Sequence, residues 1–140
     1  MKWHGVVAAG ILCVAGLPAC APSNEQILAS EESQVKLRGM QTRAFDTTDR
    51  NRMLRTIIAT LQDLGFVIDS ADEGLGTVTG TKVSFHTLRL TVTVRPRGTT
   101  QLLVRASAQH NLEAIEDPGP YQNFFASLEK SLFLTAHQVD

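Results

Sequence analysis

The chain has 140 residues, of which 43% are hydrophobic and 19% are charged, and its formal net charge is −1. This length suits one domain and is too short for two domains of ordinary size. The composition excludes a disordered or collagen-like chain, and the near-neutral charge excludes a general nucleic-acid binder.

The first 19 residues have the organisation of a signal peptide. They contain 13 hydrophobic residues, and Lys2 is followed by an uncharged stretch from Gly5 to Leu17. As a helix, this stretch spans roughly 20 Å, which is less than the ~30 Å hydrocarbon core of a membrane. We therefore predict a cleaved signal peptide over residues 1–19 rather than a membrane-spanning helix.

The signal ends in Leu17-Pro18-Ala19-Cys20, which resembles the lipobox of bacterial lipoproteins. The resemblance implies cleavage before Cys20, diacylglycerol on its sulfur and acylation of the new amino terminus, with palmitate among the acyl chains. By the same resemblance, the absence of aspartate at Ala21 implies sorting to the outer membrane. Cys20 is the only cysteine after the cleavage point, so no intramolecular disulfide is possible. The alternative is an ordinary secretory signal with a chance cysteine.

Residues 20–34 are expected to form the lipidated N-terminus and a flexible tether. The segment from Ala21 to Gln34 is polar and lacks clear periodicity. A short helix around Gln26 to Glu32 is the alternative. A single periplasmic domain is expected over residues 35–140, and its first predicted element is a strand from Val35 to Phe45.

A helix is predicted to begin near Asp49 and to end at Gly65. Residues 46–49 offer side-chain acceptors for the free N–H groups at a helix start, and glycine favours a helix stop. Apolar residues recur at offsets of three and four, which gives the stripe of a helix packed on a sheet. The stripe consists of Met53, Leu54, Ile57, Ile58, Leu61 and Leu64.

Four β segments are predicted after this helix. Leu88 to Arg95 alternates apolar and polar residues, so one face is buried and the other is wet, which is typical of an antiparallel sheet. A turn is expected at Pro96 to Thr99, because proline and glycine supply its backbone angles. The predicted β segments are 66–68, 76–83, 88–95 and 101–109.

A last helix is predicted after the turn residues 117–120. Its apolar stripe consists of Tyr121, Phe124, Phe125, Leu128, Leu132 and Ala136. The element order is therefore β-α-β-β-β-β-α. Strands joined by short turns form an antiparallel meander, and both helices must bury their stripes on its apolar face. The predicted fold is α+β, a two-layer sandwich with two helices on one face of the sheet.

No motif indicates catalysis, and we expect no enzyme, no cofactor and no metal site. The G-x-S-x-G and H-E-x-x-H patterns are absent. Gly74, Gly76 and Gly80 precede a strand rather than a helix, which favours a hairpin over a phosphate-binding loop. His86 and His110 could form a metal pair only if they end neighbouring strands, and two solvated loop histidines are the preferred interpretation.

The wet face of the sheet is the best candidate for a binding site. Arg89, Arg95 and Arg105 are expected to point outward there, together with Leu103. The planar guanidinium suits carboxylate or phosphate, so the face could dock an acidic partner or an anionic envelope polymer. A merely solvated face is the alternative. After cleavage the chain has 12 basic and 14 acidic residues, so the arginines form a local asymmetry.

Several segments resemble a family of small, uncharacterised Gram-negative outer-membrane lipoproteins. The similar segments are Met40–Arg43, Phe45–Thr47, Met53, Leu61–Phe66, Tyr121–Phe125 and Ser131–Leu134. The resemblance implies an envelope location and no activity. At fold level only, the chain is also similar to accessory lipoproteins of the β-barrel assembly machinery, which are built from small helix-on-sheet domains.

The sequence therefore predicts an outer-membrane lipoprotein anchored on the periplasmic face through lipid on Cys20. Its expected role is that of a non-enzymatic protein-interaction module in envelope assembly, secretion or transport, with an envelope protein as partner and no nucleic acid. The alternative is a binder of a small ligand or an anionic envelope polymer, which requires a concave pocket between sheet and helices.

Overall fold

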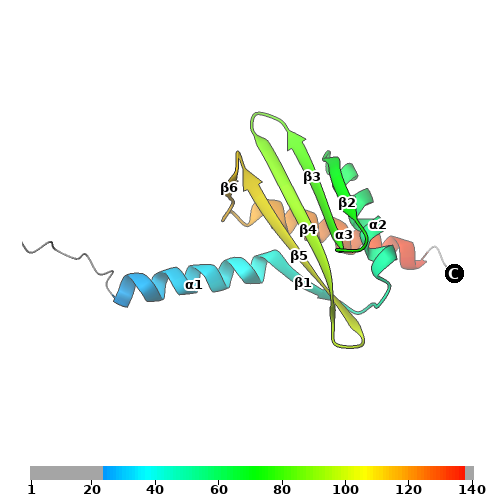
Figure 1. The fold of residues 1–140 in the computed structure, drawn as a ribbon, viewed down its shortest axis with the longest axis horizontal. Coiled ribbons are helices and arrows are strands. Elements are labelled where there is room, and N and C mark those ends of the chain that lie inside the picture. Colours follow the sequence, from blue (N-terminus) through cyan, green and yellow to red (C-terminus); the bar gives the residue numbers. More distant parts are fainter. Residues whose placement is uncertain (1–23, 138–140) are drawn as a thin grey trace, which may run out of the picture.

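Helices α2 and α3 cover one face of an antiparallel sheet, and α1 extends away from it (Figure 1). The computed structural model describes residues 24–137, so Cys20 and the predicted signal peptide lie outside it. The elements in chain order are α1 (Asn24–Gln41), β1 (Thr42–Phe45), α2 (Arg50–Asp63), β2 (Val67–Asp72), β3 (Thr77–Val83), β4 (Thr87–Arg97), β5 (Gln101–His110), β6 (Glu113–Ala114) and α3 (Gly119–His137). The predicted α+β class is confirmed.

The strand order of the sheet is β1-β5-β4-β3-β2, with β6 also paired to β5. Strands β2 to β5 form the predicted meander, and β1 adds to its far side by pairing antiparallel with β5. The alternation of β4 and β5 is confirmed, because Val92 and its cross-strand partner Ala106 are both fully buried. The apolar face therefore points toward the helices along both strands.

The core forms where the two helix stripes meet this apolar face. Helix α2 begins as predicted, because the Asp49 carboxylate caps it by accepting a hydrogen bond from the Arg52 N–H at 2.9 Å. Met53, Ile57 and Leu61 of α2 are essentially inaccessible to solvent. Helix α3 contributes large side chains, among them Phe124 and Phe125, whose rings meet edge to face with centroids 5.1 Å apart.

The N-terminal prediction was wrong in its secondary structure. Residues 24–41 form the helix α1, where a flexible tether and then a strand were expected, and the strand is confined to Thr42–Phe45. The short helix considered for residues 26–32 is part of this longer one. Residues 31–41 are rich in Glu, Gln, Lys, Leu, Arg and Met, which have favourable helix propensity. Leu37 then packs against the core and Gln41 is buried, which fixes the end of the helix.

The hairpin between β4 and β5 is longer than predicted. Its strands continue to the pairs Pro96–Leu102 and Arg97–Gln101, so the turn occupies residues 98–100 rather than 96–99. Proline is tolerated at this place because β3 pairs with β4 only as far as Thr93. Beyond that point the missing N–H of Pro96 removes no hydrogen bond to β3. The short strand β6 was not predicted.

Candidate functional site

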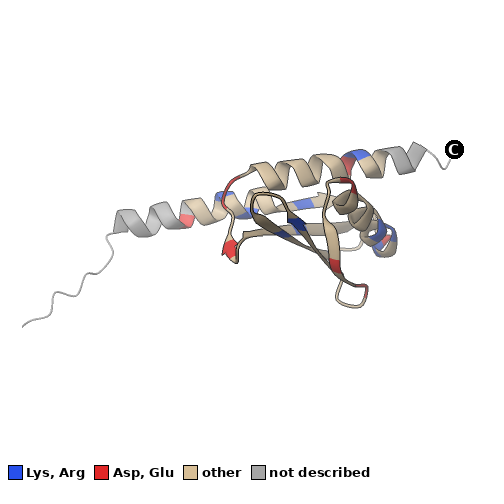
Figure 2. Cartoon of the chain, turned by 90° about the horizontal axis from the view of Figure 1, so that it is seen from above, with Lys and Arg blue, Asp and Glu red and all other residues tan. Residues whose placement is uncertain are grey.

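The face of the sheet opposite α2 and α3 carries polar side chains. Figure 2 shows basic positions on the strands, whereas several acidic positions fall in turns and loops. Threonines form the middle of this open face: Thr77 and Thr79 of β3 lie opposite Thr93 and Thr91 of β4. The hydroxyl oxygens of Thr79 and Thr91 are 3.3 Å apart, at hydrogen-bond distance. Neither α2 nor α3 covers these side chains, so the sheet has the solvent-facing polar face that was predicted.

One end of the open face holds a cluster that we call the arginine group, consisting of Arg95, Arg97, Leu103 and Arg105. Arg95 lies directly opposite Leu103, and Arg105 lies opposite Thr93. Diagonal neighbours of this kind are roughly 7–8 Å apart, within reach of two long side chains. The three arginines are exposed and Leu103 is half-buried. The sequence prediction thus correctly placed Arg95, Leu103 and Arg105 on one face.

Arg89 does not belong to the arginine group. It precedes Arg95 by six residues on β4, which corresponds to about 20 Å along an extended strand. Its cross-strand partner is Gln109. Arg89 instead lines a separate hollow of about 320 Å³, together with Thr87, Gln109, Asn111 and Leu112. The four residues predicted as one surface therefore form two separate sites.

The described residues leave the charges of the arginine group without a counter-charge. Arg105 donates a hydrogen bond from Nη2 to the Oε1 atom of Gln41 at 3.3 Å, so a neutral amide holds it. Among the side chains that the structure describes, no carboxylate pairs with Arg95, Arg97 or Arg105. Exposed guanidinium groups around a half-buried leucine can bind carboxylates in a bidentate geometry while an apolar side chain covers the leucine.

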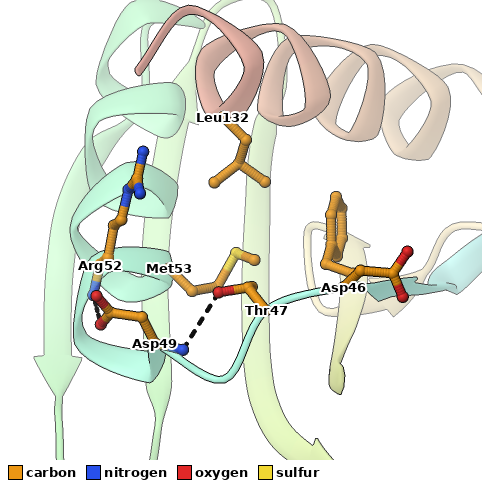
Figure 3. Close-up of a pocket in the computed structure, with 7 residues that line it drawn as sticks. Asp46, Thr47, Asp49, Arg52, Met53 and Leu132 are labelled. Carbon is orange, nitrogen blue, oxygen red and sulfur yellow. Dashed lines mark hydrogen bonds between the residues drawn. The ribbon is translucent and has the colours of Figure 1, made fainter. Parts of the chain in front are cut away.

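A hollow of about 310 Å³ lies between the N-terminus of α2 and the C-terminal half of α3 (Figure 3). Its floor includes Met53 of α2, and Leu132 of α3 lies above it. Its carboxylates already serve local structure. Asp49 caps α2, and Asp46 accepts a hydrogen bond from Gln101 Nε2 at 2.6 Å. A hollow bordered by two carboxylates does not suit an anionic polymer.

The two histidines considered in the sequence lie in contact. The ring centroids of His86 and His110 are 4.6 Å apart, and the ring planes are tilted by 59°. Across residues 24–137, no group of three or more His, Cys, Asp or Glu side chains is placed to hold a metal ion.

Sequence reasoning missed two residues of the arginine group's surroundings. Arg97 was assigned to a turn, although it continues the alternation of Arg95 by two residues. Gln41 was assigned to a strand, yet it connects Arg105 to the core. Its Nε2 donates to the Tyr121 hydroxyl at 3.3 Å. The alternation could have revealed Arg97, whereas the role of Gln41 depends on contacts 64 and 80 residues away.

No protein-family model matches the chain, and no curated protein is significantly similar to it in sequence. Within the part of the chain that the structure describes, no helix has the length and apolar character needed to cross a membrane.

Proposed function

We propose that the protein is a lipoprotein anchored to the periplasmic face of the outer membrane through lipid on Cys20. The proposal rests on the segment Leu17–Cys20, which follows a short apolar stretch and ends in the only cysteine of the mature chain. Multiple acyl chains make a stable anchor, since each buried CH₂ contributes about 0.8 kcal/mol. The domain then acts as a non-enzymatic protein-interaction module in envelope assembly, secretion or transport.

The observation that carries this function is the unneutralised arginine group on an open sheet face. A chain with an acidic excess presents three arginines around Leu103, and the described side chains supply no counter-charge to them. Arginine is enriched at protein interfaces, and opposite charges on a partner speed association and fix its register. The partner we propose is an acidic protein segment with an apolar residue that covers Leu103.

The hollow beside Arg89 supports the alternative of a small anionic ligand. Its volume of about 320 Å³ is at the lower end of the range for small-molecule sites, and Arg89, Gln109 and Asn111 supply polar groups. It lies about 20 Å from Arg95 along the strand. The two sites are therefore far enough apart for separate mutational tests.

Charge reversal of the arginine group is expected to abolish partner capture. The variant Arg95→Glu/Arg105→Glu replaces two guanidinium groups by carboxylates that repel an acidic segment. Crosslinking in envelope membranes followed by purification of the protein measures which partners remain. The matched control is Arg55→Glu/Lys130→Glu, which makes the same charge change at exposed positions of α2 and α3 and should keep the partners.

Two further variants distinguish the parts of the proposal. If Arg95→Glu/Arg105→Glu retains every crosslinked partner while Arg89→Glu loses them, the docking surface is wrongly assigned and the hollow is the site. Cys20→Ala is expected to abolish incorporation of labelled palmitate and to release the protein from the membrane. Continued palmitate labelling of Cys20→Ala contradicts the lipid anchor without touching the docking surface.

A further inference from the structure

His86 and His110 meet at the end of the sheet opposite to the arginine group. His86 lies in the loop before β4, and His110 is the last residue of β5. The backbone ties the two segments together, because His110 pairs with Leu88 and the Asn111 N–H donates to the Thr87 carbonyl at 3.2 Å. The two imidazoles therefore lie at the same end of neighbouring strands, His110 on β5 and His86 just before β4, which is the condition for a metal pair that the sequence alone left open.

The spacing of the two rings matches that of imidazoles on a shared metal ion. Metal–nitrogen bonds to histidine are about 2.0–2.1 Å long, so two rings bound at angles near 90–110° have centroids roughly 4.5–5 Å apart. The observed separation is 4.6 Å, and the 59° tilt keeps the rings from stacking face to face. The distance between the two rings is therefore compatible with one ion bound between them.

The turn after His110 is held in a strained conformation. Asn111 and Leu112 both have positive φ angles, 47° and 78°, and they connect the paired residues His110 and Glu113. Two-residue hairpin turns with two positive φ angles normally place glycine at the second position, so leucine there is costly. Strain of this kind concentrates at functional sites. Its effect here is to place Glu113 opposite His110, on the same side of the hairpin.

We infer that His86 and His110 bind a divalent transition-metal ion of the Zn²⁺ or Cu²⁺ type through one ring nitrogen each. Imidazole ligands favour Zn²⁺, Cu²⁺ and Ni²⁺, whereas Mg²⁺ and Ca²⁺ prefer sets of oxygen ligands. Water molecules complete the coordination, and the negative charge of Glu113 offsets part of the charge of the ion. The described residues supply no third protein ligand. We therefore expect the bound ion to exchange with solution, unlike the ion of a closed structural site, which has four protein ligands.

Metal binding is measured on the full chain, produced without a histidine tag, by titration with ZnCl₂ in a calorimeter. The parent is expected to bind one ion more than the variant His86→Ala/His110→Asn. Each single variant is expected to bind at least about tenfold more weakly, because even changes outside the ligand set cost roughly 10–100-fold in affinity. His137→Ala is the matched control, since it removes a histidine at the end of α3 and should leave binding unchanged.

Spectroscopy of bound Cu²⁺ separates the two histidines from other ligands. Electron paramagnetic resonance of the parent is expected to show coupling to two imidazole nitrogens, and each single variant should show one. Circular dichroism confirms that the variants are folded. The proposal is overturned if the double variant binds Zn²⁺ as tightly as the parent, or if the parent binds CaCl₂ equally well. It is also overturned if Glu113→Gln weakens binding more than either histidine change, which would mean that the acidic turn holds the ion.

Discussion

Replacing Gly76 by alanine is expected to lower the free energy of unfolding by roughly 2–5 kcal/mol. Gly76 lies in the turn between β2 and β3 with φ of +68°, a conformation that costs an L-residue about 1–2 kcal/mol. An added Cβ would also lie 2.7 Å from the Val94 carbonyl oxygen and 2.5 Å from Nη2 of Arg50. The Val94 oxygen belongs to the backbone of the central strand β4 and cannot rotate away. The β2–β3 hairpin itself must therefore move.

The turn is also held from the helix side. Arg50 of α2 donates a hydrogen bond from Nη2 to the Gly74 carbonyl at 2.8 Å, and its buried Nε has no hydrogen-bond partner among the described atoms. Meanwhile the Gly76 carbonyl accepts from the Val94 N–H at 2.8 Å. A displaced turn therefore disturbs contacts with both the helix and the sheet.

Urea unfolding followed by circular dichroism measures the effect of Gly76→Ala. Gly98→Ala is the matched control, because Gly98 also has a positive φ, +61°, but nothing lies within 4 Å of its added Cβ. The control should cost about 1–2 kcal/mol, from the backbone conformation alone. Equal losses in the two variants would show that crowding at Gly76 contributes nothing. In an Arg50→Ala background, Gly76→Ala should still destabilise, because the contact with Val94 remains.

Removing the hydroxyl of Tyr121 is expected to cost about 2–3 kcal/mol, although Tyr121→Phe creates almost no cavity. The hydroxyl donates to the Ile115 carbonyl at 2.7 Å and accepts from the Ala108 N–H and from Gln41 Nε2, both at 3.3 Å. Tyr121 is 1% exposed, so water cannot replace these hydrogen bonds. A buried group left without a partner costs about 1–3 kcal/mol.

The hydroxyl occupies a gap on the outer side of β5. Strand β1 pairs with β5 only as far as Arg105, and β6 begins its pairing at Gln109. The Ala108 N–H lies between them, and the tyrosine takes the place of a strand there. Hydrogen exchange of the Ala108 amide is therefore the specific measurement. Its protection should fall in Tyr121→Phe, together with the urea midpoint.

Gln122→Ala, on the exposed side of the same helix turn, is the matched control for Tyr121→Phe and should change stability by less than about 0.5 kcal/mol. Unchanged protection of the Ala108 amide in Tyr121→Phe would contradict the bridging role of the hydroxyl.

The secondary structure of the periodic segments was predictable, because each pattern of apolar residues fits only one kind of element. The strict alternation from Leu88 to Arg95 requires one buried face, and the stripe from Met53 to Leu61 requires a helix of matching period. Leu37, Met40 and Gln41 are covered at helical spacing, but Gln41 is polar and residues 35–41 hold few apolar side chains, so the sequence did not distinguish helix from strand there. Strand β6 has two residues and depends on the turn at Asn111 and Leu112, which no sequence rule favours.

For the candidate site, the sequence predicted on which face of the sheet the residues lie. Alternation placed Arg95, Leu103 and Arg105 on the open face correctly. It did not give the register between β4 and β5, which depends on the length of the turn. That register places Leu103 and Arg105 beside Arg95, whereas the distance of Arg89 from Arg95 follows from their six-residue offset on β4. The contact between His86 and His110 likewise depends on which residues end the two strands.

Helix α1 bears on the lipid anchor that we propose at Cys20. Leu37 packs against the core, so the helix from Asn24 to Leu37 forms a rod of about 20 Å beside the body of the domain. Only three residues separate Asn24 from Cys20, the lipid attachment point that we propose. A rod resists compression where a coil would collapse toward the bilayer. With the lipid anchor that we propose at Cys20, such a rod would separate the open sheet face from the membrane surface.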